Sequence, residues 1–489
     1  MSNAAFDIEI LSNSLYDTLI KLDQNGFAVP SLAENWEVLE EGLLFRFTLR
    51  EGVEFHTVNG FTPTRTMNAD DVVFSFNRLL NADAYFAEIG GRQAVATVFP
   101  SDKVASVTGE GLSVDIRLSS PDVELVEKLS GHDTNIQSLE YAQYLEANNK
   151  SGEFVVLPVG TGPFSFEGRS QKRFNLAKFD RYWAQSAEIS GLEFIAEPDD
   201  LERLSRLRRG DCAHAVDLGS RILQPSMSFD GFRVERAPIL SILFLALDTR
   251  QYPWSDIQVR QALSLAINRE RILRLLFVAG SGQQASLPIH PSLLGQWKAE
   301  LPEFDRARAK RLLQDVSDGR VLKLKITTFD VPRPHNPNPR RMAQLVALDL
   351  REVGIDVELE WVPAAQILDV VSDVENRRYE SLLMGYSADV PLASSLASVL
   401  MGCSNGGPKP MNFSRFCDPA ISSLLKRAST EVEADKRMQL YRDVAEASQE
   451  KMQYINILHA EYVDVIREDV VGVRRQSNGL FDFRQTQKN

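Results

Sequence analysis

Short stretches of the chain alternate between apolar and polar residues, a pattern typical of strands with one buried face. Residues 43–49 alternate in this way, as do residues 321–329 and 355–361. Residues 104–108 and 114–118 flank Gly109-Glu-Gly111 and predict a hairpin. The run Ile239–Leu247 is almost continuously apolar, which favours a strand covered on both faces. The sequence therefore predicts sheets of both the one-sided and the fully buried kind.

Other segments repeat their apolar residues at the spacing of a helix. Asp256–Leu276, Arg340–Val353 and Glu433–Met452 are predicted helices, and Asn68 is a candidate N-cap for a helix that continues past residue 76. The helix at 340–353 lies between the strands at 321–329 and 355–361. A strand–helix–strand order of this kind predicts parallel strands, so we expect an α/β fold.

The length and charge of the chain narrow its class. With 489 residues, two or three lobes are expected. No run of 18 apolar residues indicates a membrane span. The net charge of −13, with acids and bases interspersed, argues against a nucleic-acid partner and is typical of a soluble surface. Residues 1–4 have the composition of an expression-tag remnant, so the lack of a visible signal peptide does not argue against export.

Motifs of enzymes and metal sites are missing from the sequence. No HExxH helix and no GxSxG nucleophile turn occur, and the six histidines form no pair at helical spacing. Gly160-Thr-Gly-Pro-Phe164 lacks the ending of a phosphate loop and is interpreted as a structural turn. The three cysteines form no CxxC pair, which argues against zinc. We therefore predict no catalytic residue, no metal and no cofactor.

Cys403 and Cys417 enclose a segment rich in Gly, Asn, Pro and Ser. A disulfide there would close a loop of about 15 residues and contribute roughly 3 kcal/mol of stability. Two reduced thiols are the alternative, and the residues themselves do not decide between them. Cys212 is left over in either case.

Several motifs, in this order, resemble family 5 of the extracellular solute-binding proteins, which are peptide and nickel receptors of ABC importers. The resemblance covers nearly the whole chain. Its motifs are Leu15-Tyr-Asp-Thr-Leu19, Pro30-Ser-Leu-Ala-Glu-Asn-Trp36, Phe45–Arg50, Gly52–His56, Asn68–Phe74, Pro158–Phe164, Tyr182-Trp183 and Val259–Asn268. Within the family, Phe61–Asn68 is similar both to the dipeptide-binding receptors (DppA) and to receptors for antimicrobial peptides (SapA), whereas Arg333–Met342 looks closer to the dipeptide receptors. Gly385–Asp389 and the Cys403/Cys417 loop resemble a stretch that the two kinds of receptor share.

The resemblance implies a two-lobed clamshell of the periplasmic-binding-protein type II, cluster C, with an extra domain. On this basis lobe I is expected to comprise residues 5–33, 160–247 and 463–489. The extra domain would then span 34–159, and lobe II 248–462. The resemblance also implies the Cys403–Cys417 disulfide, a periplasmic location, and an N-terminal partner for Cys212 that the sequence does not contain.

The same resemblance assigns roles at the binding site. Arg333 matches the arginine that binds the peptide carboxylate, and Asp389 matches the aspartate that binds the peptide ammonium. Tyr386 and Trp361 are candidate pocket residues, although aromatic residues on strands more often belong to a core. His335, on the same loop as Arg333, is a further candidate contact. The relatives continue past the aspartate with an Asp-Pro-Asp stretch, whereas Val390-Pro-Leu-Ala393 stands here and puts dipeptide specificity in doubt.

The expected function is capture of short peptides for an inner-membrane permease, by a protein that works as a monomer. The main alternative keeps the fold but changes the ligand to a cationic antimicrobial peptide or haem. A hydrolase is disfavoured because no nucleophile–base motif is present. A sensory role on the same scaffold stays open.

Overall fold

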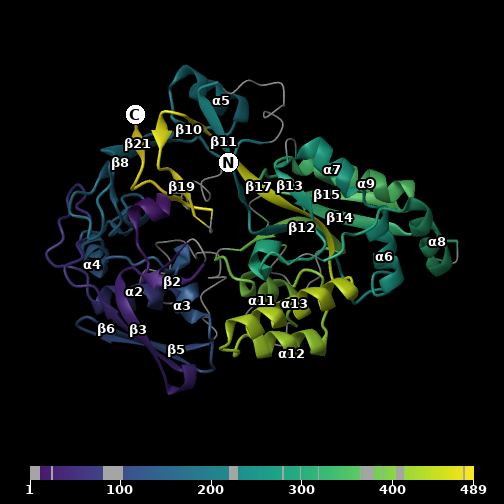
Figure 1. Ribbon diagram of the computed structural model, residues 1–489, viewed down its shortest axis with the longest axis horizontal. Helices are drawn as coiled ribbons and strands as arrows, with labels where there is room; N and C mark the ends of the chain where they lie inside the picture. Colours follow the sequence, from purple (N-terminus) through teal and green to yellow (C-terminus); the bar gives the residue numbers. More distant parts are fainter. Residues whose placement is uncertain are drawn as a thin grey trace. The chain divides into compact units, whose positions relative to one another are not determined.

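The structure, a computed structural model, describes residues 11–23, 26–80, 103–219, 230–277, 280–297, 299–317, 319–363, 366, 370, 379–388, 390–403, 412–476 and 479–489. The chain divides into two compact units (Figure 1). Unit 1 comprises Met1–Ala213 with Arg467–Asn489, and unit 2 comprises His214–Ile466. The chain therefore passes between the units twice, at adjacent points: the Arg467 N–H donates to the Ala213 carbonyl at 3.0 Å. The boundaries of the three predicted domains stay a prediction.

Unit 1 is built around a four-stranded antiparallel sheet of order β3-β4-β6-β5. Phe45 and Phe47 of β4 are buried in the same core as Val72 and Phe76 of helix α2. The predicted strand at 43–49 and the hairpin around Gly111 are both confirmed. The elements of this sheet and its helices are β3 (Ala33–Leu39), β4 (Leu44–Leu49), β5 (Val104–Glu110), β6 (Ser113–Leu118), α2 (Ala69–Leu80), α3 (Leu125–Lys128) and α4 (Leu139–Ala147).

Smaller sheets complete unit 1 and include strands from both ends of the chain. Their strands are β1 (Ile20–Leu22) with β2 (Ala28–Pro30), β7 (Phe164–Arg169) with β8 (Arg173–Lys178) and β9 (Gly191–Ile195), β18 (Val470–Val471) with β21 (Gln487–Lys488), and β19 (Arg474–Arg475) with β20 (Phe481–Asp482). Helix α5 (Asp200–Arg209) ends at Gly210, whose φ of 81° is the left-handed conformation of a glycine C-cap.

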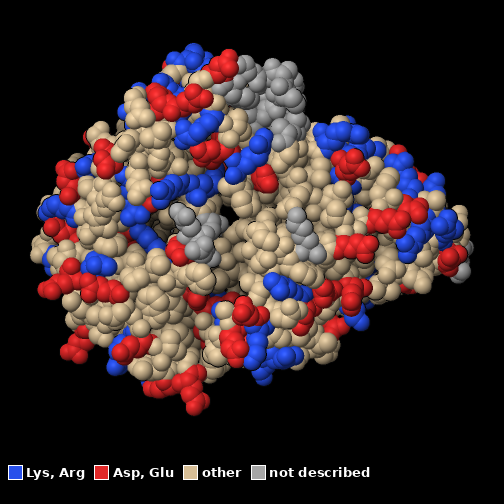
Figure 2. Space-filling model, in the orientation of Figure 1, with Lys and Arg blue, Asp and Glu red and all other residues tan. Residues whose placement is uncertain are grey.

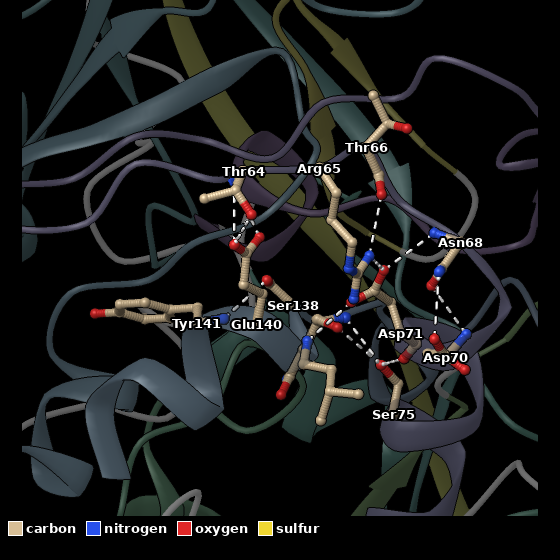
Figure 3. A network of polar contacts seen from close by, with 12 residues as sticks. Thr64, Arg65, Thr66, Asn68, Asp70, Asp71, Ser75, Ser138, Glu140 and Tyr141 are labelled. Carbon is tan, nitrogen blue, oxygen red and sulfur yellow. Dashed lines mark hydrogen bonds and ion pairs between the residues drawn. The ribbon is translucent and has the colours of Figure 1, made fainter. Parts of the chain in front are cut away.

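A buried carboxylate fixes the start of α2. Asp71 is fully buried and accepts two hydrogen bonds from Arg65, at 2.6 and 2.9 Å, and one each from the backbone N–H of Asn68 and Leu139 (Figure 3). Asn68 in turn accepts from the Asp70 N–H at 3.0 Å, as predicted for an N-cap. Next to this network, Glu140 of α4 accepts from the backbone and the hydroxyl of Thr64. Residues 64–71 are thereby tied to α4.

Unit 2 contains an eight-stranded mixed sheet of order β10-β17-β12-β16-β14-β15, with β11 and β13 paired to β17. β14 runs parallel to both β15 and β16, while β12 is antiparallel to β16 and β17. The predicted strand–helix–strand unit is confirmed as β14, α9 and β15. The strands are β10 (His214–Ala215), β11 (Phe232–Pro238), β12 (Ser241–Leu247), β13 (Gly282–Gln284), β14 (Lys323–Phe329), β15 (Asp356–Val362), β16 (Ser381–Ser387) and β17 (Ile455–Arg467).

Helices cover both faces of this sheet. Leu243 and Leu245 of β12 pack in one core with α6–α9, whereas Ile242 and Phe244 pack in another with α11–α13. Every residue of β12 is buried, which confirms the two-sided burial predicted for this run. The helices are α6 (Ile257–Ala266), α7 (Arg269–Leu276), α8 (Arg306–Ser317), α9 (Pro339–Glu352), α11 (Ser394–Met401), α12 (Pro419–Ala428) and α13 (Ala434–Glu450).

Two features concern the surface. Within the described ranges, none of the helices combines the length and the apolar character needed to cross a membrane. On the face drawn in Figure 2, lysine and arginine side chains are interspersed with aspartate and glutamate over both units, as the sequence suggested.

Candidate functional site

The described residues among the predicted site residues lie at one edge of the unit 2 sheet. β14, β15 and β16 are parallel, so their carboxyl ends lie at the same edge. Arg333 and His335 follow β14, while Trp361 and Tyr386 are the penultimate residues of β15 and β16. In open α/β sheets, ligands bind outside the carboxyl ends of the strands. Asp389, two residues past the end of β16, lies outside the described residues.

Arg333 is held in a tight turn. Its N–H donates to the Asn336 carbonyl at 3.1 Å, and the Asn336 N–H donates back to the Arg333 carbonyl at 2.9 Å. Pro334 and His335 form the two corner positions between them. The Arg333 side chain is half-buried, and its guanidinium forms no hydrogen bond or ion pair with any described residue. The turn therefore presents a positive charge that this part of the protein does not neutralise.

His335 fastens this turn to β16. Its ring lies against Gly385, where a Cβ atom would stand 2.2 Å from Cδ2 of the imidazole. Its Nδ1 lies 3.3 Å from the Ser387 hydroxyl. Burial, together with the nearby Arg333 charge, lowers the pKa of His335 to about 4. The ring is therefore neutral at pH 7 and adds no positive charge beside Arg333.

The two candidate aromatic residues lie on opposite faces of the sheet. Trp361 packs with the core beneath α6–α9, and the Arg340 guanidinium lies 4.9 Å from its ring centroid. Tyr386 packs with the core beneath α11–α13, 6.4 Å from the Phe413 ring. The structure therefore brings His335 close to the Tyr386 strand but does not place Trp361 and Tyr386 in one pocket wall.

Several buried polar atoms near this edge lack a partner, and the sequence did not single them out. Among the described residues, no hydrogen bond reaches the Oδ1 atom of Asn336 or the hydroxyls of Ser241, Ser394 and Ser395. Ser241 begins β12 opposite Ser387, and Ser394 begins α11, which follows the loop after β16. Native proteins leave few buried polar atoms unsatisfied. These atoms are therefore candidate ligand contacts.

The disulfide Cys403–Cys417 is formed and closes the segment that follows α11, with a Cα–Cα distance of 4.7 Å. This confirms the disulfide implied by the family resemblance. Cys212 is half-buried and is not part of this bridge.

A polar pocket within unit 1 has a different character. The segments near both chain ends line it, through Asn13, Ser14, Lys21, Pro163, Phe164, Tyr182, Gln476, Phe481, Asp482, Phe483 and Arg484. Its charged groups are paired: Lys21 binds Asp17 at 2.6 Å, and Arg484 binds Asp482 at 2.6 Å. Asp17 also accepts from Thr161, Tyr182 and Trp183. With its charges neutralised internally, this pocket is a weaker candidate than the edge that carries Arg333.

Comparison with known proteins gives a consistent result. Residues 28–408 match the family described as bacterial extracellular solute-binding proteins, family 5. The probable di/tripeptide-binding protein 5 of Pseudomonas aeruginosa is 30% identical, over 99% of this chain and 90% of that protein. The probable ABC transporter periplasmic-binding protein SapA of Escherichia coli is 27% identical, over 95% of this chain and 85% of that protein.

A solved structure extends the likeness to the fold. The dipeptide-binding protein of Pseudoalteromonas sp. SM9913, in complex with Met-Leu, has a TM-score of 0.85 and is 28% identical, covering 99% of this chain and 95% of that one. These findings confirm the resemblance predicted from the ordered motifs, and with it the two-lobed α/β fold.

Proposed function

Because the chain belongs to the bacterial extracellular solute-binding proteins of family 5, we propose that it is the receptor of an ABC importer and captures short peptides. The family consists of solute-binding proteins and not of enzymes. The role of such a receptor is to bind its ligand and deliver it to a membrane permease. We propose that this one works as a monomer in the periplasm, where the Cys403–Cys417 disulfide would persist.

The observation that carries this proposal is the half-buried Arg333 at the carboxyl edge of the sheet, whose guanidinium has no hydrogen bond or ion pair with any residue that the structure describes. A ligand that closes over this half-buried guanidinium has to supply a counter-charge, since a fully buried and unpaired ion costs several kcal/mol. A guanidinium binds a carboxylate through two parallel hydrogen bonds. The C-terminal carboxylate of a peptide supplies that partner, and we propose Asp389 as the partner of the peptide ammonium.

Such a site suits peptides of differing sequence. A receptor for many peptides has to recognise what they share, which is the backbone and the two charged ends. Side chains can then vary, provided that the surrounding walls accommodate them. Tyr386 and His335 are candidates for such a wall because both lie at this edge.

Isothermal titration calorimetry with a panel of dipeptides and tripeptides tests the proposal. We expect Arg333→Ala to weaken binding by about 100-fold, since truncating one partner of a buried charge pair costs roughly 2–5 kcal/mol. Arg341→Ala is the matched control, because Arg341 is an exposed arginine eight positions along and should leave affinity unchanged. Peptides with a C-terminal carboxamide should bind the wild type as weakly as free-acid peptides bind Arg333→Ala. Equal affinity of the wild type and Arg333→Ala would rule out this mode of binding.

A longer cationic peptide is the second candidate ligand. The likeness to SapA and the net charge of −13 favour it, as does the apolar stretch Val390–Ala393, whose Val390 and Ala393 are buried. Titration with a cationic peptide of about 20 residues, beside the short-peptide panel, separates the two. Haem, the remaining alternative, is tested by the visible spectrum after haem addition.

A further inference from the structure

The turn that holds Arg333 carries a second side chain with an unmet hydrogen-bonding requirement. Asn336 is only 7% exposed, and its side-chain oxygen Oδ1 is buried with no hydrogen-bond partner among the described residues. An amide oxygen of this kind can only accept a hydrogen bond. Unsatisfied buried acceptors are rare in native proteins, and a bound ligand is one explanation for such an atom.

The turn places Asn336 directly opposite Arg333. Arg333 and Asn336 are directly opposite each other in an antiparallel bridge and exchange both backbone hydrogen bonds. Side chains of directly opposite residues project to the same face, with Cβ atoms about 5 Å apart. Because the backbone bonds hold both Cα atoms in place, the turn offers donors for an anion from one residue and an acceptor for an N–H from the residue opposite.

The C-terminal residue of a peptide carries this same pair of groups. Its amide nitrogen and its carboxylate carbon are attached to one Cα, through bonds of about 1.46 and 1.52 Å. The N–H and the carboxylate therefore lie side by side at a fixed spacing. Haem propionates and other simple carboxylates offer the anion without an N–H donor at this position.

Building on the proposed function, we propose that Asn336 accepts the amide N–H of the last peptide residue, whose carboxylate binds Arg333. The turn then selects for peptides with a free C-terminus, and against carboxylates that lack the neighbouring N–H. Peptides that end in proline are excluded from this contact, because proline has no backbone N–H.

A pair of matched ligands tests the contact. One is a tripeptide that the wild type binds, and the other is its depsipeptide, in which an ester oxygen replaces the last amide N–H and the rest is unchanged. Both are titrated into the wild type and into Asn336→Ala by calorimetry. We expect the ester to bind the wild type at least tenfold more weakly than the amide. In Asn336→Ala the two ligands should bind within twofold of each other.

The results separate the role of Asn336 from peptide binding itself. A wild type that binds amide and ester equally overturns the role of Asn336 and leaves peptide binding intact. A wild type that binds no free-acid peptide overturns the proposed function, and this inference with it. If Asn336→Ala does not fold, the amide–ester comparison on the wild type still decides. A second comparison on the wild type uses the same peptide ending in alanine or in proline. The peptide that ends in alanine should bind more tightly, because proline has no N–H to donate to Asn336.

Discussion

The imidazole of His335 lies over the backbone of Gly385, so that a Cβ atom at position 385 would stand 2.2 Å from Cδ2 and 2.5 Å from Nε2 of the ring. Only glycine allows this approach. Because His335 is a corner of the Arg333–Asn336 turn, the contact sets how that turn sits on β16. A glycine in one strand thus controls the position of an arginine that follows the neighbouring strand.

We expect Gly385→Ala to weaken peptide binding by tenfold or more, because the new methyl group displaces His335 and the Arg333 turn with it. Gly168→Ala is the control, since a Cβ at that strand position meets no atom within 4 Å. The double variant Gly385→Ala/His335→Ala removes the clash and should recover part of the affinity. Calorimetry with one peptide measures all of these variants. No recovery in the double variant would show that the ring does not transmit the effect.

The hydrogen-bond network around the buried Asp71 should contribute strongly to the free energy of unfolding. Asp71→Ala removes the carboxylate that four N–H groups share, and it leaves the Arg65 guanidinium without its carboxylate partner. Loss of one member of a buried ion pair costs about 3–5 kcal/mol in the free energy of unfolding. The neighbouring Asp70 is exposed, so Asp70→Ala should cost less than about 1 kcal/mol. Urea unfolding of the two variants measures the difference, and similar midpoints would contradict the importance of the network.

Much of the fold follows from local patterns because local and tertiary requirements agree. β12 is apolar along its length, and the structure covers both of its faces with helices. The segment Asp256–Leu276, predicted as one helix, is instead divided into α6 and α7. The apolar spacing runs through the break at Ile267. Asn268 caps α7 by accepting from the Arg271 N–H at 2.8 Å, and its own N–H donates to Asp349 from α9. The second of these contacts is long-range and invisible in a sequence pattern.

Some properties of the candidate site could not be predicted from the sequence. Arg333 was found through a motif, and the structure adds that none of the described residues pairs with its guanidinium. Asn336 stands in the same motif, yet nothing in the sequence distinguishes it from a solvated loop residue. Its importance rests on which groups do not reach its oxygen, a property of the folded surroundings. Likewise, the separation of Trp361 and Tyr386 onto opposite faces depends on which helices cover each face.

The Cys403–Cys417 disulfide closes a loop with a sequence separation of 14. Cross-links of about this length contribute roughly 3 kcal/mol by restricting the unfolded chain. We expect the double variant Cys403→Ser/Cys417→Ser to lose about that much free energy of unfolding and therefore to unfold at a lower urea concentration. Dithiothreitol should lower the midpoint of the wild type toward that of the variant and leave the variant unchanged. A wild-type midpoint that is insensitive to reduction would show that the bridge adds no stability.

Buried histidines make the protein sensitive to mild acid. His459 is 2% exposed, and its Nδ1 donates to the Ser241 carbonyl at 2.7 Å. Burial lowers its pKa to about 4, from about 6.5 in an unfolded chain. Between these values the unfolded state binds the proton and the folded state does not. The contribution of His459 to the free energy of unfolding is therefore fully present above pH 6.5. It declines as the pH falls toward 4, by up to about 3 kcal/mol. His56 and His290, with pKa values lowered to about 4 and about 3, act in the same direction.

The variant His459→Gln tests this sign. It should be less stable than the wild type at pH 7, because the bond to Ser241 is weakened, but it should lose less stability between pH 6.5 and pH 4.5. Urea unfolding at half-unit pH intervals gives both slopes. Between pH 7 and 8 the two proteins should show the same pH dependence, since the histidine is neutral in both states there. If the free energy of unfolding changed with pH in the same way in the wild type and in His459→Gln at all pH values, His459 would not contribute to the acid sensitivity.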